Sequence, residues 1–207
     1  MENLLCSPIS DLLQRSCARH DHLCPRQVLG VRIGLAGLSV LGLTAPVDKG
    51  SALVISETDG CFADGLEVAS GATIGHRTLR VNDLGKIAAT FVDVRTGRAV
   101  RFAPAVDARQ RAWQYASHEP RHYFAQLQAY QEMPDDELLC FRDVLLDPSL
   151  DALLSRPALR VICSICGEDV INGRHLIVDA LPLCGTCAGQ GYYHLPDHSP
   201  LSTRDLE

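Results

Sequence analysis

The chain has 207 residues, of which 46% are hydrophobic, and it carries a formal net charge of -6 with an isoelectric point near 5.7. This length and apolar fraction suit one globular domain of ordinary size with a small appended unit. Because the chain is acidic and has no run of Lys or Arg, nucleic acid and anionic membranes are poor candidates for its main partner.

The sequence begins with MENLLCSPISDLLQ, which lacks the basic start and apolar centre of a secretory signal, so we expect a cytoplasmic protein. The most apolar stretch, 28–47, contains Arg32, Pro46 and four glycines, and therefore favours a buried helix over a membrane span. Nine cysteines without an export signal favour metal binding and free thiols over a disulfide framework.

Two helices are predicted near the amino terminus. The first runs from Ser10, a suitable cap, to Cys17, and the second begins at Pro25, because a proline N–H is not needed in a first helical turn. Apolar residues then recur at helical spacing from Val28 onward, and a lane of glycines allows another backbone to approach closely: Gly30, Gly34 and Gly37.

From residue 51 the pattern changes to that of strands. ALVISET, RTLRV and KIAATFVDV indicate three strands, and RTG turns the last of these into RAVRF as a hairpin. Residues 108–131 are helical in character with a break at Pro120. ELLCFRDVLL is a further predicted strand, with Cys140 in the core, and residues 147–160 are expected to be a connector.

The strongest motif is CSICGEDVINGRHLIVDALPLCGTC, in which two Cys-x2-Cys pairs are separated by seventeen residues. Such pairs present four thiolates to one zinc ion, and they leave no open position for water or substrate, which indicates a structural site. A disulfide pair or an iron–sulfur cluster is the alternative. The predicted ligands are Cys163, Cys166, Cys184 and Cys187, and Gly167 and Gly185 are expected in tight turns of positive φ.

A second candidate site lies in ARHDHLCPRQVLG. In an extended segment His20, His22 and Cys24 point to the same side and can converge on one metal ion. Cys24 directly precedes the predicted helix start, where the helix dipole and two imidazoles favour a thiolate. The alternative is that both histidines are surface residues and Cys24 a small buried hydrophobe.

The segment ISETDGCFADGLEVASGATIGHRTLRVNDLGK can supply further partners for this site. Cys61 and Asp64 follow a predicted strand in a glycine-rich stretch, and Thr73 and His76 come next. Clustered with His20, His22 and Cys24 they would form a functional site, whereas each alone is more typical of a turn or a cap.

Taken in order, HDHLCPRQVLG, ETDGCFADGLEVASGATIGHRTLRVNDLGKIAATF and the four-cysteine motif resemble the FmdE family, which takes its name from the E subunit of formylmethanofuran dehydrogenase. The first piece is similar to that family's His-Gly-His-x-Cys-Pro motif, and the second to its Glu-Thr-x-x-Cys-x-x-Asp segment. The resemblance extends over about residues 16–190.

The resemblance implies an α+β fold, with a mixed or antiparallel sheet and packed helices in a core domain, 1–155. It also implies a small zinc finger of treble-clef or ribbon type in 156–207, and a homodimer. A shared cleft would hold His20, His22, Cys24 and Cys61, with a second metal as a candidate, and Asp64, Thr73 and Lys86 at matching positions.

Three positions depart from the family pattern. Asp21 and Arg26 stand where the family has glycine, and they add charge at the mouth of the expected cleft. Ala72 stands where the family usually has cysteine, which removes a candidate ligand or redox partner. The chain is therefore expected to be a divergent member whose substrate can differ.

Three functions are open at this point. The first is a metal- or thiol-dependent enzyme for a small molecule, with Asp64 as acid or base and Arg26 or Lys86 attracting an anion. Thiolate and imidazole ligands suit zinc first, then nickel, copper or iron. The second is a non-catalytic accessory or metal-handling protein that binds a partner protein or cofactor. The third is a zinc-finger regulator, which the acidic charge disfavours.

Overall fold

The computed structural model describes residues 9–20, 22–48 and 50–193. The chain divides into two units, Met1–Asp147 and Pro148–Glu207. The domain boundary expected from the sequence, after residue 155, lies within the second unit. Cys6, Asp21, His194 and His198 fall outside the described residues.

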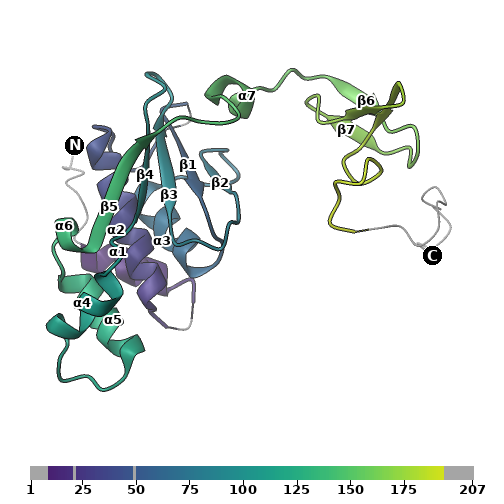
Figure 1. Cartoon of the computed structure of the whole chain (residues 1–207). Coiled ribbons are helices and arrows are strands. Elements are labelled where there is room, and N and C mark those ends of the chain that lie inside the picture. Colours follow the sequence, from purple (N-terminus) through teal and green to yellow (C-terminus); the bar gives the residue numbers. More distant parts are fainter. Residues whose placement is uncertain (1–8, 21, 49, 194–207) are drawn as a thin grey trace. The chain divides into compact units, whose positions relative to one another are not determined.

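The first unit combines one sheet with helices, which confirms the predicted α+β class (Figure 1). The described part has six helices: α1 Ile9–Cys17, α2 Pro25–Val40, α3 Cys61–Ser70, α4 Ala108–Tyr115, α5 His122–Glu132 and α6 Asp135–Leu138. It has five strands: β1 Ala52–Ser56, β2 Leu79–Val81, β3 Ala89–Asp93, β4 Ala99–Pro104 and β5 Leu139–Val144.

The sheet has the strand order β2-β1-β3-β4-β5, and it is mixed, because β1 and β2 are parallel while the other pairs are antiparallel. The predicted β3–β4 hairpin is confirmed. Val54, Phe91 and Val100 pair across three strands and are fully buried in the core. The helices α1, α2 and α3 contact one another, and α2 packs on β3 and β4.

The second unit is built from short elements: α7 Leu150–Leu154, β6 Arg160–Ile162, β7 Asp169–Ile171, β8 Leu176–Val178 and β9 Leu181–Leu183. Its strands form two antiparallel hairpins, β6–β7 and β8–β9. The connector expected over 147–160 is therefore only partly correct, because it contains α7. Ser149 caps this helix by accepting a hydrogen bond from the Ala152 backbone N–H at 3.3 Å.

The closest helix contact in the first unit is between α2 and α3. A Cβ atom placed on Gly30 would lie 2.3 Å from the Phe62 carbonyl oxygen, and one on Gly65 would lie 2.5 Å from the Gln27 carbonyl oxygen. A Cβ atom placed on Gly34 would likewise lie 2.6 Å from the Ala69 methyl carbon. The predicted glycine lane thus serves to bring two backbones together, with α3 as its partner.

Arg32 anchors the α4–α5 hairpin to α2. Its guanidinium is almost wholly buried, and it donates to the carbonyl oxygens of Tyr130 at 2.9 Å and Met133 at 2.7 Å, at the end of α5. It also donates to the Asp135 carboxylate at 2.6 Å. The last carbonyl groups of a helix have no hydrogen-bond donor within the helix, so Arg32 provides donors for the carbonyl groups at the end of α5.

One helix was not predicted from the sequence, and one expectation was wrong. The glycine-rich stretch after β1 forms the helix α3, which Gly60 precedes and Gly71 ends in a left-handed conformation. Cys140 is exposed rather than in the core. It lies on the edge strand β5 next to the buried Leu139, and neighbouring side chains of a strand point to opposite faces.

Across the residues that the structure describes, we find no helix with the length and apolar character needed to cross a membrane. The apolar stretch 28–47 instead supplies α2, which contributes Val28, Val31 and Ile33 to the core.

We expect Gly30→Ala to lower the free energy of unfolding by about 2 kcal/mol, because the added methyl group must separate α2 from α3. Urea unfolding followed by circular dichroism measures this change. Gly75→Ala is the matched control, since nothing lies within 4 Å of a Cβ atom there. Equal stability of the two variants would contradict the close α2–α3 contact.

Candidate functional site

Two cysteines begin the adjacent helices α2 and α3. Cys24 is the N-cap of α2 in an extended conformation, as predicted, and only 6% of it is exposed. Cys61 is the first residue of α3 and is half-buried. Burial raises the pKa of the Cys61 thiol, and a hydrogen bond with the Cys24 thiol raises it further. The structure therefore brings these two predicted site residues together.

The loop that holds Cys24 is fixed by a buried glutamine. The Cys24 backbone N–H donates to the Gln27 side-chain oxygen at 2.8 Å, and the Gln27 amide donates to the Ser16 carbonyl oxygen at 3.0 Å. Gln27 is fully buried. The start of α2 is thereby tied to α1, so the backbone that carries Cys24 is held from both sides.

His20 and Asp64 form a second pair beside the thiols. The His20 ring nitrogen Nε2 contacts one Asp64 carboxylate oxygen. The other oxygen lies 3.5 Å from the Arg19 guanidinium, which also donates to Glu67. Asp64 is one turn after Cys61 on α3, and its charge acts on the Cys61 thiol. A carboxylate in this position fixes the orientation of an imidazole.

His22 does not join either pair. Its side chain is exposed, and it makes no hydrogen bond or ion pair with the rest of the described chain. In the described ranges, the finger is the only group of three or more His, Cys, Asp or Glu residues whose ligand atoms all lie within 4.8 Å of one another. The metal set of His20, His22, Cys24 and Cys61 therefore stays a prediction.

The weaker candidates have local structural roles or none. The Thr73 hydroxyl accepts from the His76 backbone N–H at 3.1 Å and so helps to form a turn. Cys61 begins α3 and Thr73 follows its other end. Because α3 is about 15 Å long, Thr73 is distant from the Cys61 end of the helix. The Lys86 side chain is exposed. The Lys86 backbone N–H donates to the carbonyl oxygen of Glu57 at 3.2 Å, and Glu57 shortly precedes Cys61 in the chain.

Two of the three departures from the family pattern can be placed. Ala72 is fully buried beyond the end of α3, so the cysteine that it replaces would not lie at the start of that helix beside Cys61. Arg26 is exposed in the first turn of α2, next to Cys24, and it adds positive charge there.

Tyr123 lies close to the thiol pair, although the sequence does not single it out. It lies on α5 and is 43% exposed. Burial raises the pKa of its phenol, and the Cys24 and Cys61 thiols raise it further, which places Tyr123 beside the pair. Nothing in the sequence distinguishes it from the neighbouring aromatic residues of α5, because its role depends on how that helix packs.

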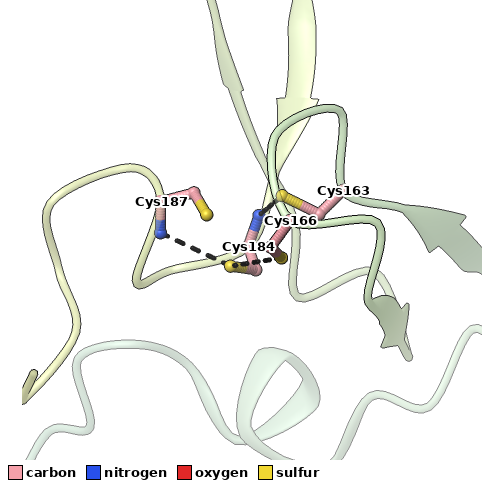
Figure 2. A group of neighbouring side chains, drawn as sticks. All are labelled: Cys163, Cys166, Cys184 and Cys187. Atoms are coloured by element: carbon pink, nitrogen blue, oxygen red, sulfur yellow. Dashed lines mark hydrogen bonds between the residues drawn. The ribbon is translucent and has the colours of Figure 1, made fainter. Parts of the chain in front are cut away.

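The four cysteines of the second unit point toward one another (Figure 2). The Cys166 and Cys184 sulfur atoms are 3.8 Å apart, and the other pairs lie within 4.8 Å. Backbone N–H groups donate to two of the sulfurs, from Cys184 to Cys163 at 3.3 Å and from Cys187 to Cys184 at 3.4 Å. The four predicted ligands therefore form a cluster that could hold a metal ion.

The turns of the finger agree with the sequence in part. Gly167 has the expected positive φ of 75°, whereas Gly185 has no positive φ. Burial acts to raise the pKa of the Cys163 thiol, but hydrogen bonds from the backbone N–H groups of Cys184, Cys166 and Ile165 outweigh it and lower the pKa to about 6. Burial raises the pKa of Cys166 to about 12. The metal-free finger therefore has one thiol ready to bind and another that must first lose its proton.

Comparison with known proteins identifies similar chains. A curated protein from Archaeoglobus fulgidus, described as a probable S-adenosyl-L-methionine-binding protein, is 38% identical over 98 residues. This match covers 46% of the present chain but only 27% of the relative, so the chain spans about a quarter of that protein's length.

A solved structure has the same fold. It is a tungsten formylmethanofuran dehydrogenase FmdE-like protein from Syntrophus aciditrophicus, with a TM-score of 0.59 and 21% identity over 93% of this chain and 98% of that one. A sequence profile described as "FmdE, Molybdenum formylmethanofuran dehydrogenase operon" matches residues 19–140, which include both helix starts and the whole sheet up to β5. The chain belongs to the FmdE family.

Proposed function

We propose that this chain is an enzyme that acts on a small molecule at the Cys24–Cys61 site, through a thiolate or a bound transition metal. The observation that supports this proposal is the pair of thiols at two adjacent helix starts, next to an imidazole backed by a carboxylate. Helix starts favour negative charge, which counters the rise in the pKa of Cys61 that burial and the Cys24 thiol cause.

His20 and Asp64 have distinct roles in this proposal. One ring nitrogen of His20 faces Asp64, so the other can accept a proton from a thiol or a substrate. Asp64 orients the ring, and Arg19 holds Asp64 in place. Arg26, exposed beside Cys24, attracts an anionic group of the substrate.

The donor chemistry suits a transition metal. Cys24, Cys61 and His20 would hold it, and two sulfurs with one imidazole favour zinc, with nickel, copper or iron behind it. Such an ion would supply Lewis-acid chemistry. Tyr123 lies near the same thiols from α5.

Metal handling without catalysis is the second candidate function. One observation favours it: in the described part of the chain, the His20, Cys24 and Cys61 donor atoms are not gathered within 4.8 Å of one another. A site that receives and releases an ion needs ligands that are not already locked together. An accessory protein that passes a metal or cofactor to a partner would have this property.

S-Adenosyl-L-methionine, the molecule in the description of the Archaeoglobus fulgidus relative, is a candidate small molecule for this site. The Tyr123 phenol is close enough to the thiols for them to raise its pKa, and aromatic rings attract cations such as a sulfonium group. Equilibrium dialysis with the labelled compound tests this candidate directly.

For the finger we infer that the metal is zinc and that its role is structural. Four thiolates at about 2.3 Å from a zinc ion lie about 3.8 Å apart, in keeping with the Cys166–Cys184 distance of 3.8 Å. The homodimer and the cytoplasmic location stay proposals, which light scattering and cell fractionation can test.

The enzyme proposal predicts that Cys24→Ser and Cys61→Ser each abolish turnover, and that Asp64→Asn lowers it about 100-fold, because His20 loses its charged partner. Wild-type protein and variants are incubated with a mixture of small metabolites, and conversion is followed by mass spectrometry. Cys140→Ser is the control, since this thiol is exposed on β5.

Two outcomes would count against the enzyme proposal. If a compound is converted equally by the wild type and by Cys24→Ser, the thiol pair is not the reactive centre. If nothing is converted but both cysteine variants lose one bound metal per chain in elemental analysis, metal handling is the better assignment.

For the finger, we expect Cys184→Ser to lower the bound zinc by one ion per chain and to unfold the second unit, since so small a unit depends on its metal. The first unit keeps its own core and should unfold as in the wild type. Elemental analysis and proteolysis with sequencing of the fragments measure both effects. Protease resistance of residues 160–187 without zinc would contradict a structural metal.

Zinc affinity of the finger should fall as the pH is lowered. Between pH 8 and 7 zinc must displace a proton from Cys166, with its pKa of about 12, so each unit of pH changes the affinity by about tenfold or more. Below pH 6 the Cys163 thiol also becomes protonated, because its pKa is about 6, and the dependence steepens. Competition with a chromophoric chelator at several pH values measures this slope, and a flat profile would contradict it.

A further inference from the structure

A pocket of about 840 Å³ lies in the first unit, away from the cysteine site. We propose that it binds an uncharged, mainly apolar small molecule. It is bordered by the last turns of α2 and by the inner faces of β4 and β5. Its volume falls within the range of pockets that enclose small ligands.

The pocket exists because α2 does not cover the whole sheet. A Cβ atom on Gly37 would lie 2.3 Å from the Phe91 ring, so α2 is pressed against β3 at this point. Phe102 on β4 meets Phe91 edge to face, and it stacks on Phe141 of β5 at 5.1 Å between ring centres. Phe141 is 57% exposed. Phe102 and Phe141 therefore form one wall of the pocket.

The remaining walls are mostly aliphatic. Leu35 and Ala36 of α2 line the pocket, together with Leu43 of the following loop and Val68 of α3. Leu35, Ala36 and Leu43 are only half-buried, so apolar surface is left open to a ligand. Removing such apolar surface from water favours binding.

The charged groups of the pocket lining favour an uncharged ligand. Arg15 and Asp136 are of opposite sign, and neither forms an ion pair within the described chain. Asp135 is neutralised by Arg32 at 2.6 Å. With no net charge left to attract an anion or a cation, apolar contact is the main source of affinity, and Ser39 and Thr44 can bind a single polar group.

The pocket is separate from the proposed reactive site. Cys24 precedes the first residue of α2, whereas Leu35 is ten residues further along the same helix, which corresponds to about 15 Å. A ligand in the pocket is therefore not the substrate beside Cys24, and the inference does not depend on the proposed function.

The test is the binding of N-phenyl-1-naphthylamine, an uncharged apolar probe whose fluorescence rises in apolar surroundings. We expect saturable binding of one probe per full-length chain. Ala36→Trp, which fills the pocket, and Phe141→Ser, which removes an exposed wall, should each weaken binding about tenfold. Val106→Trp is the matched control, because Val106 is fully exposed outside the pocket, and it should bind as the wild type does.

Phe141→Ser changes an exposed side chain, so it keeps the test valid if Ala36→Trp does not fold. Absence of saturable binding to the wild type, or wild-type affinity in Phe141→Ser, would overturn the proposal. Binding that appears only when a dimer is diluted to monomers would show that a second copy covers the pocket. Binding that appears only after residues 1–8 are removed would show that the chain fills its own pocket, and either result overturns the proposal.

Discussion

The arrangement of the first unit depends on the backbone contact between Gly30 of α2 and Gly65 of α3. No side chain fits there, since a Cβ atom on either glycine would lie 2.5 Å or less from a carbonyl oxygen of the other helix. Because the two helices touch near their first turns, their starts lie side by side. The residues at these starts are Cys24 and Cys61, so the thiol pair is a direct result of the glycine contact.

The two sets of cysteines in this chain are suited to different tasks. The finger gathers four sulfurs within 4.8 Å and donates backbone N–H groups to two of them, which is typical of a site built to keep its ion. Cys24 and Cys61 do not belong to a cluster of this kind among the described residues. They stand at helix starts with a histidine, a carboxylate and a phenol nearby, and this mixture of groups is typical of a site that reacts or exchanges.

Much of this structure could be predicted from the sequence because local patterns determine it. Helical spacing and Pro25 place α2, alternation and the RTG turn place the β3–β4 hairpin, and the spacing of the finger cysteines places the metal cluster. The helix α3 was missed because its glycines resemble those of a loop. The reason for a glycine at position 65 is the close backbone contact with Gly30, which is distant in the sequence. Long-range packing of this kind leaves no local pattern.

The same limit applies to single side chains. The capping of α5 by Arg32 and the position of Tyr123 both follow from how α5 lies against α2, which no local pattern contains. His20 and His22 are equivalent in the sequence, yet one meets Asp64 and the other faces solvent. The rule that alternate residues share a side holds only while the segment stays regular, and this segment is a loop between two helices.

The exposed position of Cys140 has a practical consequence for handling the protein. An exposed thiol on an edge strand is accessible both to small oxidants and to the thiol of a second chain. In preparations kept without reducing agent, air oxidation can join two chains at this sulfur. A band of doubled mass on a non-reducing gel would then report storage conditions rather than native assembly, and reduced samples are needed to judge how many chains associate.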